Sequence, residues 1–178
     1  MVNIKEITTE RRNPRTMNID AMSTIDIIKT LNQEDQLVPL VVEKALPQVA
    51  VVIDKVYEVL YNGGRLIYMG AGTSGRIGIL DASECPPTYG TDPDMVIALI
   101  AGGEKAMTVA IEGAEDDTEM AVADLKRIHL SNKDILIGLS ASGRTPYVVA
   151  GVQYAKKVGA LTACVTTSER TILAQMVD

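Results

Sequence analysis

The sequence predicts an α/β fold, in which a mainly parallel sheet carries helices on both faces and follows an N-terminal helical arm. Three observations predict it. Four apolar runs rich in strand-forming residues alternate with segments of helical spacing, an order typical of parallel sheets. The chain has six Tyr, no Phe and no Trp, so branched aliphatic residues and eight Met must fill the core, as in buried parallel strands. Its 178 residues match about one domain, and no repeat or linker divides them.

The first 36 residues predict a surface arm rather than a part of the core. They are polar, and only the stretch from Met22 to Leu31 has a modest apolar periodicity, which predicts one short helix. Such an arm packs either on its own domain or on a partner subunit, and its residues do not decide between the two. We therefore expect an arm and helix over residues 1–45, followed by one domain over residues 46–178.

A helix followed by a strand–loop–helix unit opens the main domain. An apolar stripe over residues 46–61 predicts the helix, and the two glycines that come soon after it act as a stop signal. Residues 65–69 form a short apolar run that predicts a strand. The glycine-rich loop 70–75 then separates this strand from a helical segment that begins at residue 76.

The same alternation continues along the chain. In order, the sequence predicts a strand at 95–103, helices at 104–117 and 118–128, a strand at 134–140, a helix at 147–159 and a strand at 161–167. In a parallel sheet the carboxyl ends of the strands meet at one edge, where we expect the binding loops. The strand at 161–167 would carry an unpaired outer edge, which favours association with another chain.

The loop GAGTSG at 70–75 fits the pattern G-x-G-x-x-G between a strand and a helix, and three interpretations are open. A dinucleotide site also needs an acidic residue that ends the second strand, but that strand ends in glycines with only Glu104 beyond it. A single phosphate needs no such residue, because the hydroxyls of Thr73 and Ser74 and the free N–H groups of the helix start can hold it. The third interpretation is a tight turn without a ligand.

A second loop repeats this chemistry. The loop SASGRTP at 140–146 follows a predicted strand and opens the next helix, with a proline as an early helical residue. Two hydroxyl-rich loops after two parallel strands can converge on one phosphate and the polar body of a sugar, whereas a nucleotide site would use one loop for the pyrophosphate. Together the loops favour a phosphate site, although SASGRT alone is an ordinary helix start and Arg144 can be a solvated residue.

Two segments supply candidate carboxylates for acid–base chemistry. Glu84 lies one helix away from the first loop, and the pair Pro86-Pro87 is expected to end that helix and hold the carboxylate in place. The run IEGAEDD at 111–117 contains four acidic residues, most of which we expect to face solvent. The single histidine, His129, is expected at the surface, so a Ser-His-Asp triad is poorly supported.

Charge, cysteine usage and hydropathy argue against several classes of protein. The net charge is −6 and no basic block is present, so nucleic acid is not an expected partner. Cys85 and Cys164 are too far apart for a metal-binding or redox pair, and no ligand spacing predicts a metal. No apolar run approaches the roughly 18 residues of a membrane span, and the charged N-terminus does not resemble a signal peptide. We expect a cytoplasmic protein without a membrane contact.

Several strings resemble one known family. TERRNPRTMNIDAMST, GRLIYMGAGTSGRIGILDASECPPTYG, IAGGEKAM, IEGAEDD and SASGRTPYV are similar to the N-acetylmuramic acid 6-phosphate etherases, bacterial enzymes of the sugar isomerase (SIS) fold that are related to the glucokinase regulatory proteins. The resemblance implies a three-layer SIS sandwich. It also implies cleavage of the lactyl ether of N-acetylmuramic acid 6-phosphate to N-acetylglucosamine 6-phosphate and D-lactate, without a metal or organic cofactor. A non-catalytic sugar-phosphate regulator and an NAD-dependent dehydrogenase remain as alternatives.

Residue by residue, the resemblance places the two catalytic glutamates of the family on Glu84 and Glu115. We expect Glu84 to protonate the departing lactate and Glu115 to remove the C2 proton, although the residues themselves also allow the reverse assignment. The resemblance and the two loops together predict the residues that bind the sugar phosphate: Gly72, Thr73, Ser74, Gly75, Ser140, Ser142, Gly143, Arg144 and Thr145.

Members of this family are considerably longer than the sequence, so the last strand and several helices of the family fold would lie beyond Asp178. The resemblance and the polar arm predict a homodimer. We expect the 178-residue chain by itself to bind sugar phosphate weakly and to show little or no etherase turnover.

Overall fold

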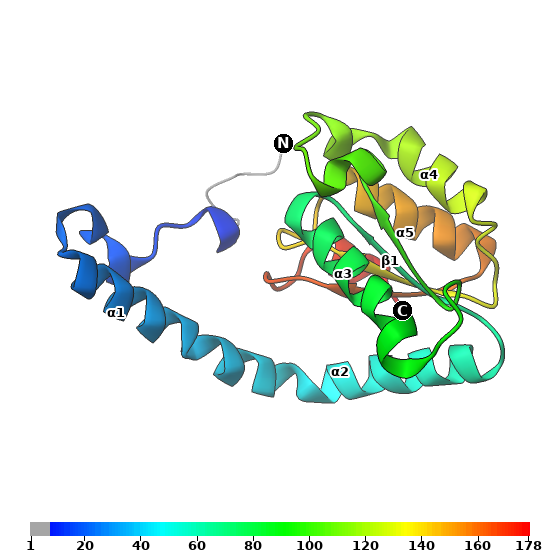
Figure 1. Ribbon diagram of the computed structural model, residues 1–178, viewed down its shortest axis with the longest axis horizontal. Helices are drawn as coiled ribbons and strands as arrows, with labels where there is room; N and C mark the ends of the chain where they lie inside the picture. Colours follow the sequence, from blue (N-terminus) through cyan, green and yellow to red (C-terminus); the bar gives the residue numbers. More distant parts are fainter. Residues whose placement is uncertain (1–7) are drawn as a thin grey trace. The chain divides into compact units, whose positions relative to one another are not determined.

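A computed structural model describes residues 8–178 of the chain (Figure 1). These residues form two compact units, and the division falls between Asp54 and Lys55. Each unit is described by itself. The α-helices and strands are α1 (Thr24–Asp35), α2 (Leu37–Tyr61), β1 (Leu66–Gly70), α3 (Gly72–Tyr89), β2 (Val96–Ile100), α4 (Thr118–Arg127), β3 (Ile135–Leu139), α5 (Pro146–Val158), β4 (Leu161–Val165) and α6 (Ile172–Met176).

The second unit contains a four-stranded sheet in the order β2-β1-β3-β4, and every neighbouring pair is parallel. Gly70, the last residue of β1, lies opposite Ile100 of β2 and Leu139 of β3, so these three strands end level with one another. This arrangement confirms the predicted α/β class and the four predicted strands.

One face of the sheet forms the main core with α4, α5 and α6. Ile67, Met69 and Leu136 are fully buried in one cluster with side chains of α5. Helix α5 packs closely here, because a Cβ added at Gly151 would lie 2.2 Å from the Met69 sulfur. The buried Tyr147 hydroxyl donates to the Asp124 carboxylate at 2.7 Å and so ties α5 to α4. Burial and this carboxylate raise the pKa of Tyr147, which keeps the phenol a donor.

Helix α3 covers the opposite face, as Figure 1 shows. It lies close to the strands because Gly78 faces them without a side chain: an added Cβ would lie 3.0 Å from both Tyr68 and Leu139 side-chain atoms. Burial first, and then a hydrogen bond to Asp81 of α3, raise the pKa of Tyr68. Helices on both faces of a parallel sheet are what the sequence predicted.

An ion pair at the opposite end of β1 joins the beginnings of β1 and β3. The Arg65 guanidinium donates to Asp134 through Nε at 3.1 Å and through its terminal nitrogen at 2.8 Å. The backbone N–H groups of Arg65 and Ser131 donate to the same carboxylate. Burial alone would raise the pKa of Asp134, but the hydrogen bonds from Arg65 and Ser131 outweigh it and hold this pKa below its ordinary value.

The first unit is helical and exposes many apolar side chains. Ser23 caps α1 by accepting from the Asp26 N–H, and Arg15 pairs with Glu34 near the end of that helix. The arm therefore holds more helix than the short segment predicted, because α2 begins at Leu37 rather than at residue 46. The helical stretch Thr24–Tyr61 includes a window of mean hydropathy 1.5, long and apolar enough by length and composition to cross a membrane. The sequence predicted no apolar run of this length, because the near-continuous succession of α1 and α2 was not foreseen.

Two further predicted elements differ from the structure. Residues 104–117 form two 3₁₀ helices, Glu104–Met107 and Ala114–Asp116, instead of one α-helix. The first of them ends at Met107, and Gly113, whose φ is 74°, precedes the second, so no continuous helix crosses that residue. Helix α3 runs through Pro86-Pro87 to Tyr89 and ends at Gly90, whose φ is 67° and whose N–H donates to the Pro86 carbonyl.

The outer edge of β4 is partly covered, although the sequence predicted it to be unpaired. The Asp178 N–H donates to the Thr162 carbonyl at 3.2 Å, and the Thr162 N–H donates to the Asp178 carboxylate at 3.0 Å. Helix α6, which precedes this contact, was not predicted. It spans only Ile172–Met176, too short a stretch for an apolar periodicity to become visible.

Candidate functional site

The loop after β1 is built on a close approach between two glycines. Strand β1 ends at Gly70, and α3 begins at Gly72 after one extended residue. A Cβ added at Gly75 would lie 2.9 Å from the Gly70 carbonyl oxygen, and one added at Gly70 would lie 2.7 Å from the Gly75 nitrogen. Only glycine at both positions lets the helix start this close to its strand. Thr73 and Ser74 therefore lie in the first helical turn, where backbone N–H groups have no helical acceptor and can bind an anion.

The loop after β3 is held from within by Ser140. This serine is 3 % exposed, its hydroxyl lies 2.9 Å from the Thr145 hydroxyl, and it accepts from the Gly143 N–H at 3.0 Å. Gly143 has a φ of 63° and packs against Thr171, so it too shapes the loop. The structure therefore gives Ser140 an internal hydrogen-bonding role.

The two loops leave the sheet side by side. Strands β1 and β3 are neighbours that end at the same level, so the loop beginning at Ala71 and the loop beginning at Ser140 start next to each other. From β1 the chain continues to β2 on one side, whereas β3 and β4 lie on the other. This is a topological switch point, the place where open α/β sheets bind ligands at the carboxyl ends of their strands. All nine predicted phosphosugar-binding residues belong to these two loops.

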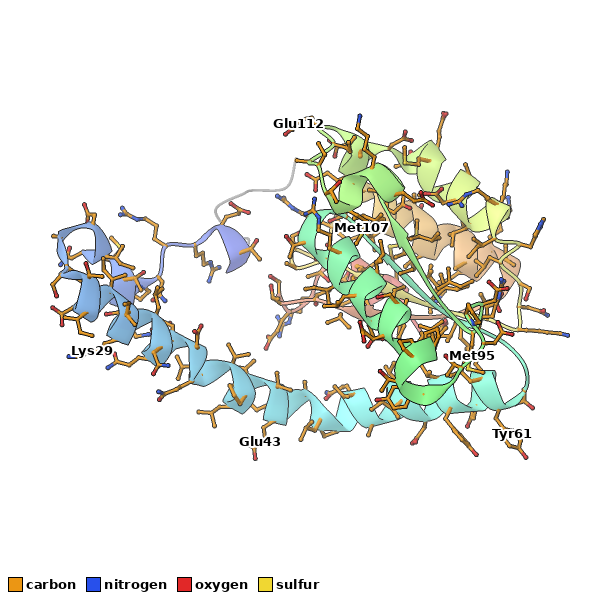
Figure 2. The ribbon with its side chains drawn as sticks, viewed as in Figure 1. Lys29, Glu43, Tyr61, Met95, Met107 and Glu112 are labelled. Carbon is orange, nitrogen blue, oxygen red and sulfur yellow. The ribbon has the colours of Figure 1, made fainter. Side chains whose placement is uncertain are left out.

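A pocket of about 200 Å³ opens beside the first of these loops. Gly72 and Arg76 of α3 line one side of it, and Glu112 and Glu115 of the β2–α4 connection line another. Figure 2 shows Glu112 and Met107 on this connection. The structure therefore brings Glu115 together with the start of α3. The residues of the loop 140–145 do not line this pocket.

Glu84 lies elsewhere on the same chain. It follows Gly72 by twelve residues of one continuous helix, which places it roughly 18 Å along the axis at 1.5 Å per residue. Its side chain is exposed, and Ile77 and Leu80 on the same helix are also exposed. Within a single chain, Glu84 therefore lies one helix away from the first loop and not beside it. The prediction that Pro86-Pro87 end this helix is wrong, because α3 continues to Tyr89.

Sequence reasoning missed Arg76, which lines the pocket directly after the GTSG loop. Its Nε–H donates to the Met107 carbonyl at 3.0 Å, and a terminal N–H donates to the Ala106 carbonyl at 2.8 Å. The signal that could have found it was the basic residue placed in the first turns of the helix that carries the anion-binding motif. The glycines Gly102 and Gly103, both with positive φ, were the sign that the segment facing it is not helical.

A parallel α/β sheet with two glycine- and hydroxyl-rich loops at its switch point defines a domain of the SIS type. Comparison with known proteins gives the family: residues 48–156 match the model of the glucokinase regulatory protein N-terminal SIS domain. The chain belongs to this family.

The chain is also similar to curated relatives named N-acetylmuramic acid 6-phosphate etherase, as its motifs indicated. It is 51 % identical to the protein of Actinobacillus pleuropneumoniae serotype 5b over 98 % of the chain and 58 % of the relative. It is 55 % identical to that of Caldanaerobacter subterraneus subsp. tengcongensis, over 98 % of the chain and 57 % of the relative. The chain thus spans less than two thirds of the length of these relatives.

Solved structures agree on the fold. A phosphoheptose isomerase from Francisella tularensis matches with a TM-score of 0.69 at 18 % identity, over 88 % of the chain and 82 % of the isomerase. The phosphoheptose isomerase GmhA from Neisseria gonorrhoeae matches with the same TM-score and coverage. At this identity the likeness supports the SIS fold and says nothing about the reaction.

Proposed function

We propose that the protein containing this chain is an N-acetylmuramic acid 6-phosphate etherase of the cytoplasm, which releases D-lactate and leaves N-acetylglucosamine 6-phosphate. The observation that carries the proposal is the position of Glu115, which lines one pocket with the anion-binding start of α3. A carboxylate next to a phosphate-binding turn is what proton removal from a phosphorylated sugar requires. The etherase names of relatives about 50 % identical over nearly the whole chain support the same reaction.

The reaction needs one base and one acid. In the ring-opened sugar, the ether oxygen is on the carbon β to the aldehyde, so loss of the C2 proton to Glu115 gives an enolate. The enolate expels lactate as the bond between C3 and the ether oxygen breaks, and Glu84 donates the proton that the departing lactate takes up. Glu84 then removes a proton from a water that adds to C3, and C2 is reprotonated. The proposed sequence uses side chains alone, without a cofactor or metal.

We further propose a homodimer in which Glu84 acts in the pocket of a second copy. Within one chain, the length of α3 separates Glu84 from the start of that helix, whereas the exposed Ile77 and Leu80 beside it suit a protein contact. The exposed apolar side chains of α2 fit the same interpretation. A membrane fits them less well, because Glu43 and Lys44 in the middle of the helical stretch would place two charges in lipid.

Mixing two inactive variants tests the shared site. We expect Glu84→Gln and Glu115→Gln proteins, each nearly inactive alone, to recover about a quarter of the wild-type lactate release after subunit exchange. The reason is that half of randomly formed dimers are mixed, and one of their two symmetric sites keeps both glutamates. A Glu84→Gln protein mixed with the doubly substituted protein serves as the control and should stay inactive. If the first mixture also stays inactive, the two glutamates do not share a site across subunits.

Calorimetry tests the ligand class. We expect the protein to bind N-acetylglucosamine 6-phosphate, to bind N-acetylglucosamine at least about 10-fold more weakly, and not to bind NAD(H). Removing the phosphate takes a charged acceptor from the loop N–H groups, and each such hydrogen bond contributes about 1.5–3 kcal/mol. Binding of NAD(H) without a response to sugar phosphates would contradict the proposal and support a dehydrogenase.

A sugar-phosphate regulator is the second candidate, because the matching family model describes a regulatory protein. Such a protein would bind the phosphorylated sugar without changing it. An enzymatic assay for D-lactate, run on the full natural protein with N-acetylmuramic acid 6-phosphate, separates the two candidates. Binding without lactate release would favour the regulator.

A further inference from the structure

Arg76 occupies a position in the pocket that the proposed mechanism has not used. It is partly buried, belongs to the second turn of α3, and is the basic residue among the described residues that line the pocket. Its two hydrogen bonds go to consecutive backbone carbonyls, those of Ala106 and Met107, in the connection between β2 and α4. A planar guanidinium fork can hold two neighbouring acceptors in one geometry, which a lysine ammonium cannot do.

Packing contacts connect the segment bound by Arg76, at Ala106 and Met107, to the residues next to Glu115. Gly102 has a φ of 88°, and a Cβ added there would lie 3.1 Å from Ile111 and 3.2 Å from Ala106, so these two side chains pack together over it. Ile111 in turn accepts from the Ala114 N–H at 3.4 Å, directly before Glu115. The connection is thus folded on itself, and the contacts between Arg76 and Glu115 pass through buried Ala106 and half-buried Ile111.

Glu115 is held only by a short element, whose buried residue Ala114 packs in the main core. Its own 3₁₀ helix has only three residues, Ala114–Asp116, and the Glu115 side chain is exposed. The hydrogen bonds to Ala106 and Met107 add a side-chain link from α3, the helix that begins with the anion-binding turn, to the connection that bears the carboxylate.

We propose that Arg76 is a positioning residue that sets the place of Glu115 relative to the start of α3. This role rests on the proposed function, because it needs Glu115 to act on a substrate held at that helix start. A displacement of about 1 Å in a catalytic group can lower a rate by about 10²-fold. The bonds from Arg76 to Ala106 and Met107 would prevent such a displacement.

Two measurements on the full natural protein test this role with Arg76→Met, Arg76→Lys and the control Arg127→Met. Arg127 pairs with Asp124 on α4, so its variant removes the same side chain away from the pocket. Without ligand, we expect Arg76→Met to speed amide hydrogen exchange over residues 106–115 and Arg127→Met to leave it unchanged. With substrate, we expect Arg76→Met to lower kcat by about 10²-fold with little change in KM, and Arg76→Lys to recover part of the loss.

A double substitution separates positioning from other effects. In a protein that already carries Glu115→Gln, adding Arg76→Met should cause no further loss of turnover, because the two residues act as one unit. Unchanged amide exchange in Arg76→Met would overturn the role. So would an increase in KM with an unchanged kcat, because that result would indicate that Arg76 binds the phosphate of the substrate. If the wild-type protein releases no lactate, both the proposed function and the role of Arg76 are wrong. If the wild-type protein is active and Arg76→Met is equally active, only the role of Arg76 is wrong.

Discussion

Glu115→Gln is expected to lower kcat for lactate release by about 10²–10⁴-fold, the usual contribution of a general base. Glutamine keeps the size of the side chain in the pocket but has no carboxylate to take the C2 proton. The full natural protein would be assayed for D-lactate, with Glu119→Gln as the control, because Glu119 is an exposed glutamate of α4 that does not line the pocket. Near-normal turnover of Glu115→Gln would remove this residue from the mechanism.

Deuterium exchange at C2 assigns the two glutamates to their roles. If Glu115 is the base, its glutamine variant loses exchange of the C2 proton together with lactate release. Glu84→Gln should lose lactate release by a similar factor while the C2 proton still exchanges with solvent, since only the acid is missing. The opposite pattern would exchange the two assignments.

Asp134→Ala is expected to lower the free energy of unfolding by about 3 kcal/mol, the lower end of the range for breaking a buried ion pair. Asp134 is 3 % exposed, and its loss would leave the Arg65 guanidinium and the Ser131 N–H without their acceptor. The lower end applies because Arg65 keeps 25 % of its side chain in solvent. Urea unfolding measures the change, with Asp54→Asn as an exposed control.

The same carboxylate gives the stability a pH dependence with a definite sign. The pKa of Asp134 in the folded protein lies below the ordinary value of 3.8, so the folded state favours the charged form. Its contribution is therefore present well above the ordinary pKa of 3.8 and is lost as the pH falls through the folded-state pKa. Asp134→Asn should lack this part of the acid-induced loss. An unchanged acid profile in that variant would show that other carboxylates account for all of it.

The sheet could be predicted from the sequence because buried parallel strands are short, apolar and bounded by glycine or polar loops. Three of the four predicted runs contain an observed strand in full, as the run 134–140 contains β3, and the run 65–69 covers β1 except for Gly70. The segment 104–117 misled the prediction because its apolar residues have helical spacing. Its path is set instead by positive-φ glycines such as Gly113 and by the contacts of Arg76, which join residues about 30 positions apart and leave no local signal.

The sequence also predicted part of the candidate site, namely the two loops at one edge of the sheet. The loops at 70–75 and 140–145 follow adjacent parallel strands, so their shared edge follows from the alternation of strands and helices. The sequence also placed Glu84 one helix away from the first loop, as the structure does. The continuation of α3 through Pro86-Pro87 did not follow from the sequence, because the proline rule predicted an earlier end.

The strand order also affects how the protein emerges from the ribosome. The central strand β1 is made first, and β2 can pair with one of its edges after about 30 further residues, since Leu66 lies opposite Val96. The other edge of β1 stays unpaired until β3 has been synthesised, because Leu66 also lies opposite Ile135. At 5–20 residues per second, that gap of roughly 70 residues lasts about 3–14 seconds. During that time the nascent chain exposes an apolar strand edge that is open to other chains, so chaperone dependence during synthesis should centre on β1.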